Sequence, residues 1–284
     1  MLKYLAPAKI NLVLEVLRKR DDGYHEIRSL VQTVSLYDVL EFESANGISL
    51  KCSDPSLQTS DNLVIKAAEL LRQVSGCQKG AWIKLEKRIP WGMGLGGGSS
   101  DAATTLLALN KLWESKLPTS GLVELASRLG SDVPFFIHGG AALIEGRGEK
   151  VTPLSTSVTG WFVLLVPPLT KIPNKTKQLY SSLDDTHFTD GHLVDTAFKY
   201  WSKDMPVATS LLFNVFDKVV FRAFPGLEQY WRRFEEAGAK DFHLAGSGPA
   251  LFAPVHDKAQ AEKIYRQLQR QKLEAYLVYS GIPL

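Results

Sequence analysis

The sequence has little cysteine and no long apolar run. Its two cysteines, Cys52 and Cys77, match neither a C-x-x-C motif nor a zinc ribbon. No stretch approaches the roughly 18 uninterrupted apolar residues that a membrane span needs. The first residues also lack the pattern of a secretion signal or a transit peptide. We therefore expect a cytoplasmic protein with free thiols and no membrane partner, although the sequence alone leaves a disulfide open.

An excess of one charge is missing as well. The formal net charge is only +3, from 33 basic and 30 acidic side chains, and the basic clusters at 18–20 and 232–233 are typical of solvated surface. A net charge this close to zero does not indicate a nucleic-acid partner, and we expect none. Hydrophobic content of 45% and charged content of 22% are ordinary for a globular protein, and 284 residues suit one large domain or two smaller ones.

The hydrophobic pattern predicts an α+β fold. Strand-like patterns cover 9–17, 27–42, 47–53, 82–89, 141–146, 161–168, 250–255 and 275–280. Helical patterns cover 61–74, 100–114, 120–130, 193–202, 206–222, 226–237 and 257–271, and 168–192 is polar and irregular. The elements do not follow strict βαβ alternation, which argues against a doubly wound sheet. A run rich in Pro, Ser and Thr near 150–160 predicts two domains, 1–155 and 156–284.

The segment "GMGLGGGSSD" (92–101) contains a literal G-x-G-x-x-G at Gly92, Gly94 and Gly97. A dinucleotide fingerprint lies directly between a strand and a helix and is followed about 20 residues later by an acidic residue. Here Pro90 separates the strand from the glycines, and 115–121 is neither strand-like nor acidic. A Walker A loop ends in Gly-Lys-Ser/Thr, and this loop has no lysine. Neither familiar nucleotide motif fits.

The loop nevertheless suits a polyphosphate. Contiguous glycines let backbone N–H groups converge on an anion, and the helix predicted to begin at 99–101 adds unpaired N–H groups and the positive end of its dipole. The hydroxyls of Ser99 and Ser100 can bond to phosphate or approach a phosphate-bound Mg²⁺. A flexible linker or a close-packed turn before a helix is the structural alternative.

The segment "PWGMGLGGGSSDAATTL" (90–106) resembles the second motif of the GHMP kinases, the superfamily of galactokinase and of homoserine, mevalonate and phosphomevalonate kinases. The resemblance implies an N-terminal domain like ribosomal protein S5, a C-terminal ferredoxin-like α/β sandwich, and a loop that wraps the phosphates of ATP, with Mg²⁺ bound to ATP. It also implies a second phosphate turn in "HLAGSGPALFAPV", which alone is a plain β-turn. The implied ATP contacts are Pro90, Gly92, Gly94, Leu95, Gly96, Gly97, Gly98, Ser99, Ser100, Gly246, Ser247 and Gly248.

Two further motifs supply candidate catalytic groups. In "APAKINLVL", Lys9 and Asn11 share one face of a strand, where a lysine is costly to bury unless it is paired. An edge-strand lysine is the alternative, but the segment resembles the first motif of the family, whose lysine and asparagine lie at the active centre. In "GSDVPFF" (130–136), Pro134 predicts an extended Val133 and a non-helical Asp132. Alone, Asp132 is a turn or cap residue; the resemblance implies a general base kept ionised by Lys9.

The resemblance is strongest to the GHMP subfamily that phosphorylates a hydroxyl of cytidine diphosphate methylerythritol with ATP. It implies that Tyr24 stacks on the cytosine ring and that His25 hydrogen-bonds the base, whereas "DDGYHEI" alone is a turn before a strand. The softer contacts it implies are Asn62 and Lys87 for adenine, and Thr176 and Tyr180 for the substrate. No acidic cluster marks a metal site, so no protein ligand for Mg²⁺ is predicted.

Two alternatives stay open at this point. One is another GHMP kinase acting on homoserine, mevalonate or a sugar, against which the pair Tyr24 and His25 argues, because a small alcohol offers no base to stack on. The other is a nucleotide-binding module without catalysis, against which Lys9 and Asp132 argue. The sequence does not distinguish a monomer from a weak dimer.

Overall fold

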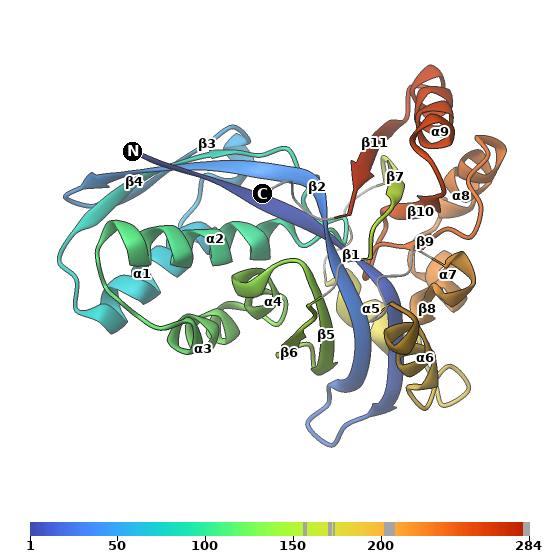
Figure 1. Ribbon diagram of the computed structural model, residues 1–284, viewed down its shortest axis with the longest axis horizontal. Helices are drawn as coiled ribbons and strands as arrows, with labels where there is room; N and C mark the ends of the chain where they lie inside the picture. The colour runs from blue at the N-terminus through green and yellow to red at the C-terminus, as the bar shows by residue number, and fades with distance from the viewer. Residues whose placement is uncertain (156–157, 170–171, 173, 202–207, 281–284) are drawn as a thin grey trace. The chain divides into compact units, whose positions relative to one another are not determined.

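The computed structural model describes residues 1–155, 158–169, 172, 174–201 and 208–280 (Figure 1). The chain forms two compact units, and neither is one continuous stretch of sequence. Unit 1 comprises Met1–Ala8, Leu36–Trp91 and Gly96–Gly139, and unit 2 comprises Lys9–Ser35, Gly92–Leu95 and Gly140–Leu284. The long strands β1 (Leu2–Lys19) and β2 (His25–Ala45) therefore supply residues to both units. The expected division into 1–155 and 156–284 stays a prediction.

Unit 1 packs helices on one face of a sheet (Figure 1). In the sheet, β4 (Gly80–Glu86) pairs antiparallel with the second half of β2 and parallel with β3 (Ile48–Cys52). Alternate residues such as Phe42 and Ile83 are buried because successive side chains of a strand point to opposite faces. The other elements of this unit are η1 (Pro55–Leu57), α1 (Leu63–Ser75), α2 (Gly97–Leu112), α3 (Thr119–Leu129) and α4 (Val133–His138).

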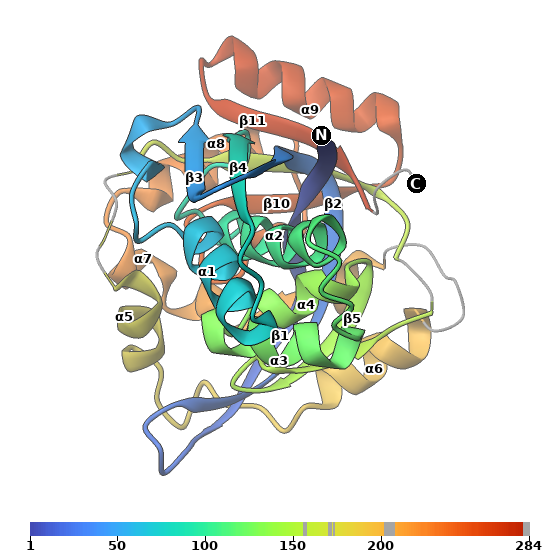
Figure 2. The same ribbon diagram turned by 90° about the vertical axis from the view of Figure 1, so that its left-hand side faces the viewer.

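Unit 2 contains a hairpin of β1 and β2 and a separate four-stranded sheet. The hairpin is extended by β5 (Ala141–Gly146), which pairs with β2, by β6 (Lys150–Pro153), and by β8 (Phe213–Asn214), which runs parallel to β1. The second sheet has the order β11 (Glu274–Tyr279), β7 (Trp161–Val166), β10 (Leu251–Val255), β9 (His243–Leu244). Figure 2 shows α9 (Lys258–Arg270) lying along β11.

The remaining elements of unit 2 are short. They are α5 (Lys175–Ser181), α6 (His192–Trp201), η2 (Thr209–Leu211), η3 (Val215–Lys218), α7 (Val220–Ala223) and α8 (Leu227–Glu236). Both cysteines are free, as expected. Within the described ranges, no helix is long and apolar enough to cross a membrane.

Most predicted elements are confirmed, but the helix predicted over 206–222 is wrong. Residues 206 and 207, like residue 202 at the end of the helix predicted over 193–202, lie outside the described residues. From Ala208 onward the chain forms η2, β8, η3 and α7 in place of one helix. The cause is Asn214, whose side chain accepts a hydrogen bond from Phe216 N and donates to Leu244 O and Gly246 O. Tertiary contacts thus override a weak helical preference. The segment predicted as irregular over 168–192 also contains the short helix α5.

The backbone expected around Asp132 is also wrong. Asp132 has φ −84° and ψ −13°, in the helical region, and Val133 is the first residue of α4. Pro134 is therefore at the second helical position. A proline is tolerated there because the N–H groups of the first turn have no partner within the helix. The local preference of a residue before proline is outweighed by burial, since Val133 is fully buried.

The side chain of Asn62 caps the start of α1. Asn62 Oδ1 accepts a hydrogen bond from Val64 N (2.9 Å), and its Nδ2 donates to Leu57 O (2.8 Å). Asn62→Ala should therefore lower the free energy of unfolding by about 1 kcal/mol, measured by urea denaturation. Asn62→Asp keeps the capping acceptor and should recover most of that loss. Equal losses in the two variants would contradict a capping role.

Candidate active site

Lys9 is buried in unit 2 and belongs to a short chain of hydrogen bonds. Its Nζ donates to Asn11 Oδ1 at 2.7 Å, Asn11 Nδ2 donates to Ser29 Oγ at 2.8 Å, and Ser29 Oγ donates to Val13 O at 2.6 Å. Lys9 and Asn11 are each only 6% exposed. The predicted shared face of the strand is confirmed, and the ammonium group is held in one place by neighbours that are themselves bonded.

The first residues of the glycine loop pack against the turn that precedes β10. Lys9 N donates to Leu95 O (2.9 Å), and Ala250 N donates to Met93 O (3.2 Å). Gly94 has φ +89°, and a Cβ placed there would lie only 2.0 Å from Ala245 O. No side chain larger than hydrogen fits this position, so the glycine is required by a close backbone contact.

The turn at Gly246 approaches the same lysine. Gly246 has φ +58°, and an added Cβ would lie 3.0 Å from Lys9 Nζ and 3.1 Å from both Asn11 Oδ1 and Gly94 O. Residues of three sequence motifs, represented by Lys9, Gly94 and Gly246, therefore meet within unit 2. Asn214 holds this turn through its bonds to Leu244 O and Gly246 O. Sequence reasoning missed Asn214, although an amide within the apolar run "LLFNVF" was a visible signal.

Ser247, in the same turn, connects to α5. Lys175 Nζ donates to Ser247 O and to Ser247 Oγ, both at 3.2 Å, and also to Gly248 O. Thr176 Oγ1 lies 3.0 Å from Ser247 Oγ. The structure thus places the predicted residue Thr176 beside the third motif. It adds Lys175, which sequence reasoning missed, as a second cation there.

An aromatic cluster surrounds His25 in unit 2. The His25 and Tyr180 rings are stacked, with centroids 4.9 Å apart and an interplanar angle of 23°, and Phe188 and Phe216 contact this pair edge-on. Tyr24 is instead 55% exposed, with the Arg147 guanidinium 4.6 Å from its ring centroid. Two of the three predicted substrate residues of this region, His25 and Tyr180, therefore lie together.

His25 is set up to be neutral. Burial lowers its pKa below the ordinary value of 6.5, and the positive charge of Lys19 lowers the pKa further. At pH 7 the ring consequently offers one N–H donor and one lone pair, which is the hydrogen-bonding capacity suited to a neutral heterocyclic base.

In unit 1, a second buried lysine lies beneath the later part of the loop. Lys87 Nζ donates to Asp101 Oδ2 at 2.8 Å and to Asp38 Oδ2. Asp38 Oδ1 also accepts from Arg88 N (2.5 Å) and Ile89 N (2.8 Å). A Cβ on Gly97 would lie 2.9 Å from Lys87 Nζ. This network of Asp38, Lys87 and Asp101 ties the residue after β4 to the N-terminal part of α2, and sequence reasoning missed both carboxylates.

The two carboxylates of this network have different environments. Asp38 accepts hydrogen bonds from two backbone N–H groups and from the ammonium group of Lys87. Burial raises the pKa of Asp101 to about 8 against the opposing effect of the Lys87 charge, and the nearby Asp38 raises the pKa further. Asp101 Oδ1 is buried and has no hydrogen-bond partner among the described residues. Asp101 therefore keeps a proton near neutral pH.

The start of α2 presents the groups predicted to hold phosphate. The helix begins at Gly97, earlier than the predicted 99–101, with Gly96 at the N-cap position in a left-handed conformation (φ 74°). Ser100 Oγ is buried and has no hydrogen-bond partner among the described residues. A hydroxyl placed in the first helical turn without a partner fits a polar ligand at this helix start.

For several predicted site residues, the structure shows contacts or exposure that leave the predicted role untested. Pro90 is half-buried, Gly92 and Gly98 are exposed, and Ser99 is half-buried at the start of α2. Asn62 caps α1, and Lys87 is bonded to two carboxylates, so their adenine contacts stay predictions. Asp132 is exposed at the start of α4 in unit 1, whereas Lys9 belongs to unit 2. Their direct pairing also stays a prediction.

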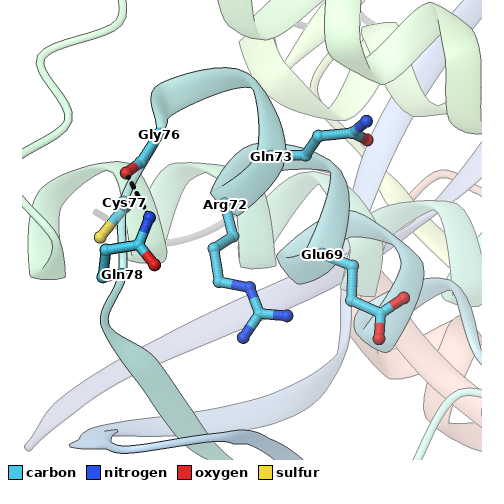
Figure 3. A pocket seen from close by; sticks show the side chains of 6 residues that line it. All are labelled: Glu69, Arg72, Gln73, Gly76, Cys77 and Gln78. Carbon is cyan, nitrogen blue, oxygen red and sulfur yellow. Dashed lines mark hydrogen bonds between the residues drawn. The ribbon is translucent and has the colours of Figure 1, made fainter.

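A surface depression near the end of α1 lies away from all these residues. It has a volume of about 610 Å³ and is lined by polar side chains (Figure 3). The lining residues are Glu69, Arg72, Gln73, Gly76, Cys77 and Gln78. None of them belongs to the glycine loop or to the residues around Lys9, so we do not assign the active site to this depression.

Comparison with known families gives the class of protein. Residues 62–140 match the family model described as the GHMP kinases N-terminal domain, and residues 197–275 match the GHMP kinases C-terminal model. The matches fall on either side of the domain boundary expected near residue 155. The chain belongs to the GHMP kinase family, with its two-domain fold of mixed α and β structure.

Individual proteins of this family are similar to the chain over nearly its whole length. The chain is 46% identical over 284 residues, all of both chains, to 4-diphosphocytidyl-2-C-methyl-D-erythritol kinase of Dehalococcoides mccartyi (strain ATCC BAA-2266 / KCTC 15142 / 195). It is 40% identical over 275 residues, 95% of each chain, to the enzyme of the same name from Pelotomaculum thermopropionicum.

Solved structures agree with this placement. A crystal structure of 4-(cytidine 5'-diphospho)-2C-methyl-D-erythritol kinase matches with a TM-score of 0.84 and 34% identity, over 99% of this chain and 100% of that one. The structure of homoserine kinase from Cytophaga hutchinsonii matches with a TM-score of 0.72 but only 18% identity, over 99% and 94% of the two chains. The second likeness shows the shared fold alone.

Gly246→Ala tests the close approach of the turn to Lys9. The methyl group would meet Lys9 Nζ, Asn11 Oδ1 and Gly94 O at 3.0–3.1 Å and displace the ammonium group. We expect kcat/KM for phosphoryl transfer to fall by about 10²-fold, the effect of a small misplacement at a reacting centre. Gly76→Ala is the matched control, since Gly76 has a similar φ of +66° but nothing within 4 Å of an added Cβ. Equal activity losses would attribute the effect to backbone strain and contradict the argument.

The pH dependence of stability tests the protonation of Asp101. Because its pKa in the folded state is raised from 3.8 to about 8, the folded protein binds one more proton than the unfolded chain across that interval. Its contribution to the free energy of unfolding should fall as pH rises, by up to about 1.4 kcal/mol per pH unit.

Urea denaturation at pH 5, 6, 7 and 8 measures this slope. Asp101→Asn keeps an acceptor for Lys87 but does not titrate, so its stability should depend less steeply on pH than that of the wild type. Asp61→Asn changes a carboxylate that is 90% exposed and should keep the wild-type slope. If Asp101→Asn also keeps the wild-type slope, Asp101 is not the titrating group.

Proposed function

We propose that this chain catalyses the ATP-dependent phosphorylation of a hydroxyl of 4-diphosphocytidyl-2-C-methyl-D-erythritol, giving the 2-phosphate and ADP, in the synthesis of isoprenoid precursors. The observation that carries the kinase assignment is the meeting of Lys9 with Gly94 and Gly246, which joins three family motifs around one buried ammonium group. The names of full-length relatives at 40–46% identity supply the substrate.

The glycine positions support the nucleotide half of the proposal. An added Cβ would meet nothing within 4 Å at Gly92 and only Leu63 Cδ1, at 3.9 Å, at Gly98, so the backbone at these two points is open to a close approach. Phosphoryl transfer depends on positioning and on cations set against phosphate charge. Lys9 supplies such a cation, and the N–H groups at the start of α2 supply hydrogen bonds. Mg²⁺ bound with ATP would neutralise further charge; we assign it no protein ligand.

In the proposed reaction the acceptor hydroxyl oxygen attacks the γ-phosphorus of ATP in line with the bond to the β-phosphate oxygen. The new P–O bond forms, ADP leaves, and the hydroxyl proton passes to the Asp132 carboxylate. The positive charge of Lys9 would offset negative charge on the transferred group.

The aromatic cluster supports the substrate half. The stacked rings of His25 and Tyr180 offer a flat apolar surface of the kind on which a pyrimidine stacks, and the neutral imidazole can hydrogen-bond the base edge. Tyr24, which is exposed, can cover the base from solvent. A small alcohol such as homoserine or mevalonate would leave these groups unused.

A substrate panel tests the proposal. ADP release in a coupled assay should be fast with the cytidyl substrate and at background with homoserine, mevalonate and galactose. Faster turnover of one of the other alcohols would reassign the substrate within the family. ATP binding without transfer to any of them would favour a nucleotide-binding module over a kinase.

Asp132→Asn tests the proposed base. The amide cannot accept the proton, so the rate at saturating substrate should fall at least about 10²-fold, at the lower end of general acid–base contributions. Glu124→Gln, at another exposed carboxylate of unit 1, should keep the wild-type rate. Unfolding curves of both variants check that the fold is unchanged. Near-normal turnover of Asp132→Asn would remove Asp132 from the chemistry.

A further inference from the structure

A buried glutamate in unit 2 takes no part in the proposed reaction. Glu15 lies on β1 and is 0% exposed. Its Oε2 accepts a hydrogen bond from Val194 N (2.8 Å) in the first turn of α6. Its Oε1 is also buried and has no hydrogen-bond partner among the described residues. A buried carboxylate oxygen without a donor is costly, so this atom requires a partner that the described side chains do not supply.

Two further ligand-type side chains lie beside this oxygen. Glu15, Asp190 and His192 each offer an atom within 4.8 Å of the others, the one such group of three among the described residues. The imidazole Nδ1 of His192 lies 2.5 Å from Asp190 Oδ1. Glu15 forms the buried floor of this group, and Asp190 and His192 form its solvent-exposed side.

The charges around the group favour a cation. Two carboxylates face one imidazole, which leaves a net negative charge when the imidazole is neutral. A basic side chain close to the group is Arg28, whose Nη1 donates to Gly191 O (3.4 Å). Arg28 is already paired with Asp195 (2.9 Å) and Glu145 (3.1 Å), so its charge is largely balanced elsewhere.

We propose that Glu15, Asp190 and His192 bind one divalent transition-metal cation of the Zn²⁺ class. One imidazole nitrogen and two carboxylate oxygens are a donor set that Zn²⁺ and Co²⁺ accept, with water completing the coordination. Binding replaces the hydrogen bond between Asp190 and His192. The His192 side chain is 65% exposed, so its ring can turn to allow metal–ligand bonds of about 2.0–2.2 Å.

This site is separate from the proposed phosphate chemistry. Glu15 follows Lys9 by six residues of one strand, which corresponds to about 20 Å. Mg²⁺ prefers oxygen ligands and is poorly matched to an imidazole. The cation would join the 190–194 segment to β1 and so stabilise the fold on this side of the hairpin. The proposal does not depend on the identity of the kinase substrate.

Co²⁺ titration of the EDTA-treated full-length protein tests the site. We expect saturable visible absorption with one Co²⁺ per chain, displaced by Zn²⁺, and a Tm that rises with Zn²⁺ concentration because the metal binds only the folded state. His192→Ala should weaken binding at least about tenfold, the smallest effect expected from loss of a ligand or of its outer partner. Glu15→Gln, which keeps an acceptor for Val194 N, should weaken binding as well.

His187→Ala is the matched control. His187 Nδ1 lies 2.7 Å from Asp184 Oδ1, so this is the same kind of His–Asp pair without a buried glutamate, with a half-buried imidazole and an exposed carboxylate. The variant should bind Co²⁺ like the wild type. The proposal is overturned if wild-type protein shows no saturable Co²⁺ absorption, or if His187→Ala weakens binding as much as His192→Ala. It is also overturned if NMR shows a protonated His192 that Zn²⁺ does not perturb, since the imidazolium then neutralises Glu15.

Discussion

The burial of the Lys9 ammonium group is the constraint on which the arrangement in unit 2 depends. A buried lysine is tolerated only when its charge is hydrogen-bonded, and here Asn11 supplies an acceptor that Ser29 holds in turn. The space left around the ammonium group is too small for a side chain at Gly246. The same position that makes Lys9 costly also gives it a fixed direction toward the turn and the loop, which is what electrostatic catalysis requires.

A second buried lysine plays a comparable part in unit 1. Lys87 lies between Asp38 and Asp101 and beneath Gly97, so the later half of the glycine loop rests on a balanced set of charges. Removing one member of such a set leaves a buried charge without a partner. The glycines of the loop therefore have a steric role in addition to the flexibility that they give the backbone. They allow the backbone to pass close to a lysine or to another backbone segment, and these contacts fix its path.

The glycine loop, most helices and strands, and the shared strand face of Lys9 and Asn11 could be predicted from the sequence, because these features depend on local periodicity and residue type. The sequence could not place Asp38 or Asp101 beside Lys87, since that network joins residues 14 to 49 positions apart. It also misplaced 206–222, where the bonds of Asn214 and the pairing of β8 with β1 decide the backbone. The extended backbone predicted for Val133 was wrong for a similar reason. Burial of its side chain outweighs the backbone preference of a residue that precedes a proline.

The central claim is that Lys9, the glycine loop and the Gly246 turn hold the phosphates of ATP. A crystal structure with a non-hydrolysable ATP analogue and Mg²⁺ tests it most directly. The account predicts phosphate oxygens hydrogen-bonded by N–H groups at the start of α2, with the Lys9 ammonium group in contact with the terminal phosphate. A nucleotide bound elsewhere, or bound at the loop with the Lys9 ammonium group out of contact with phosphate, would contradict it.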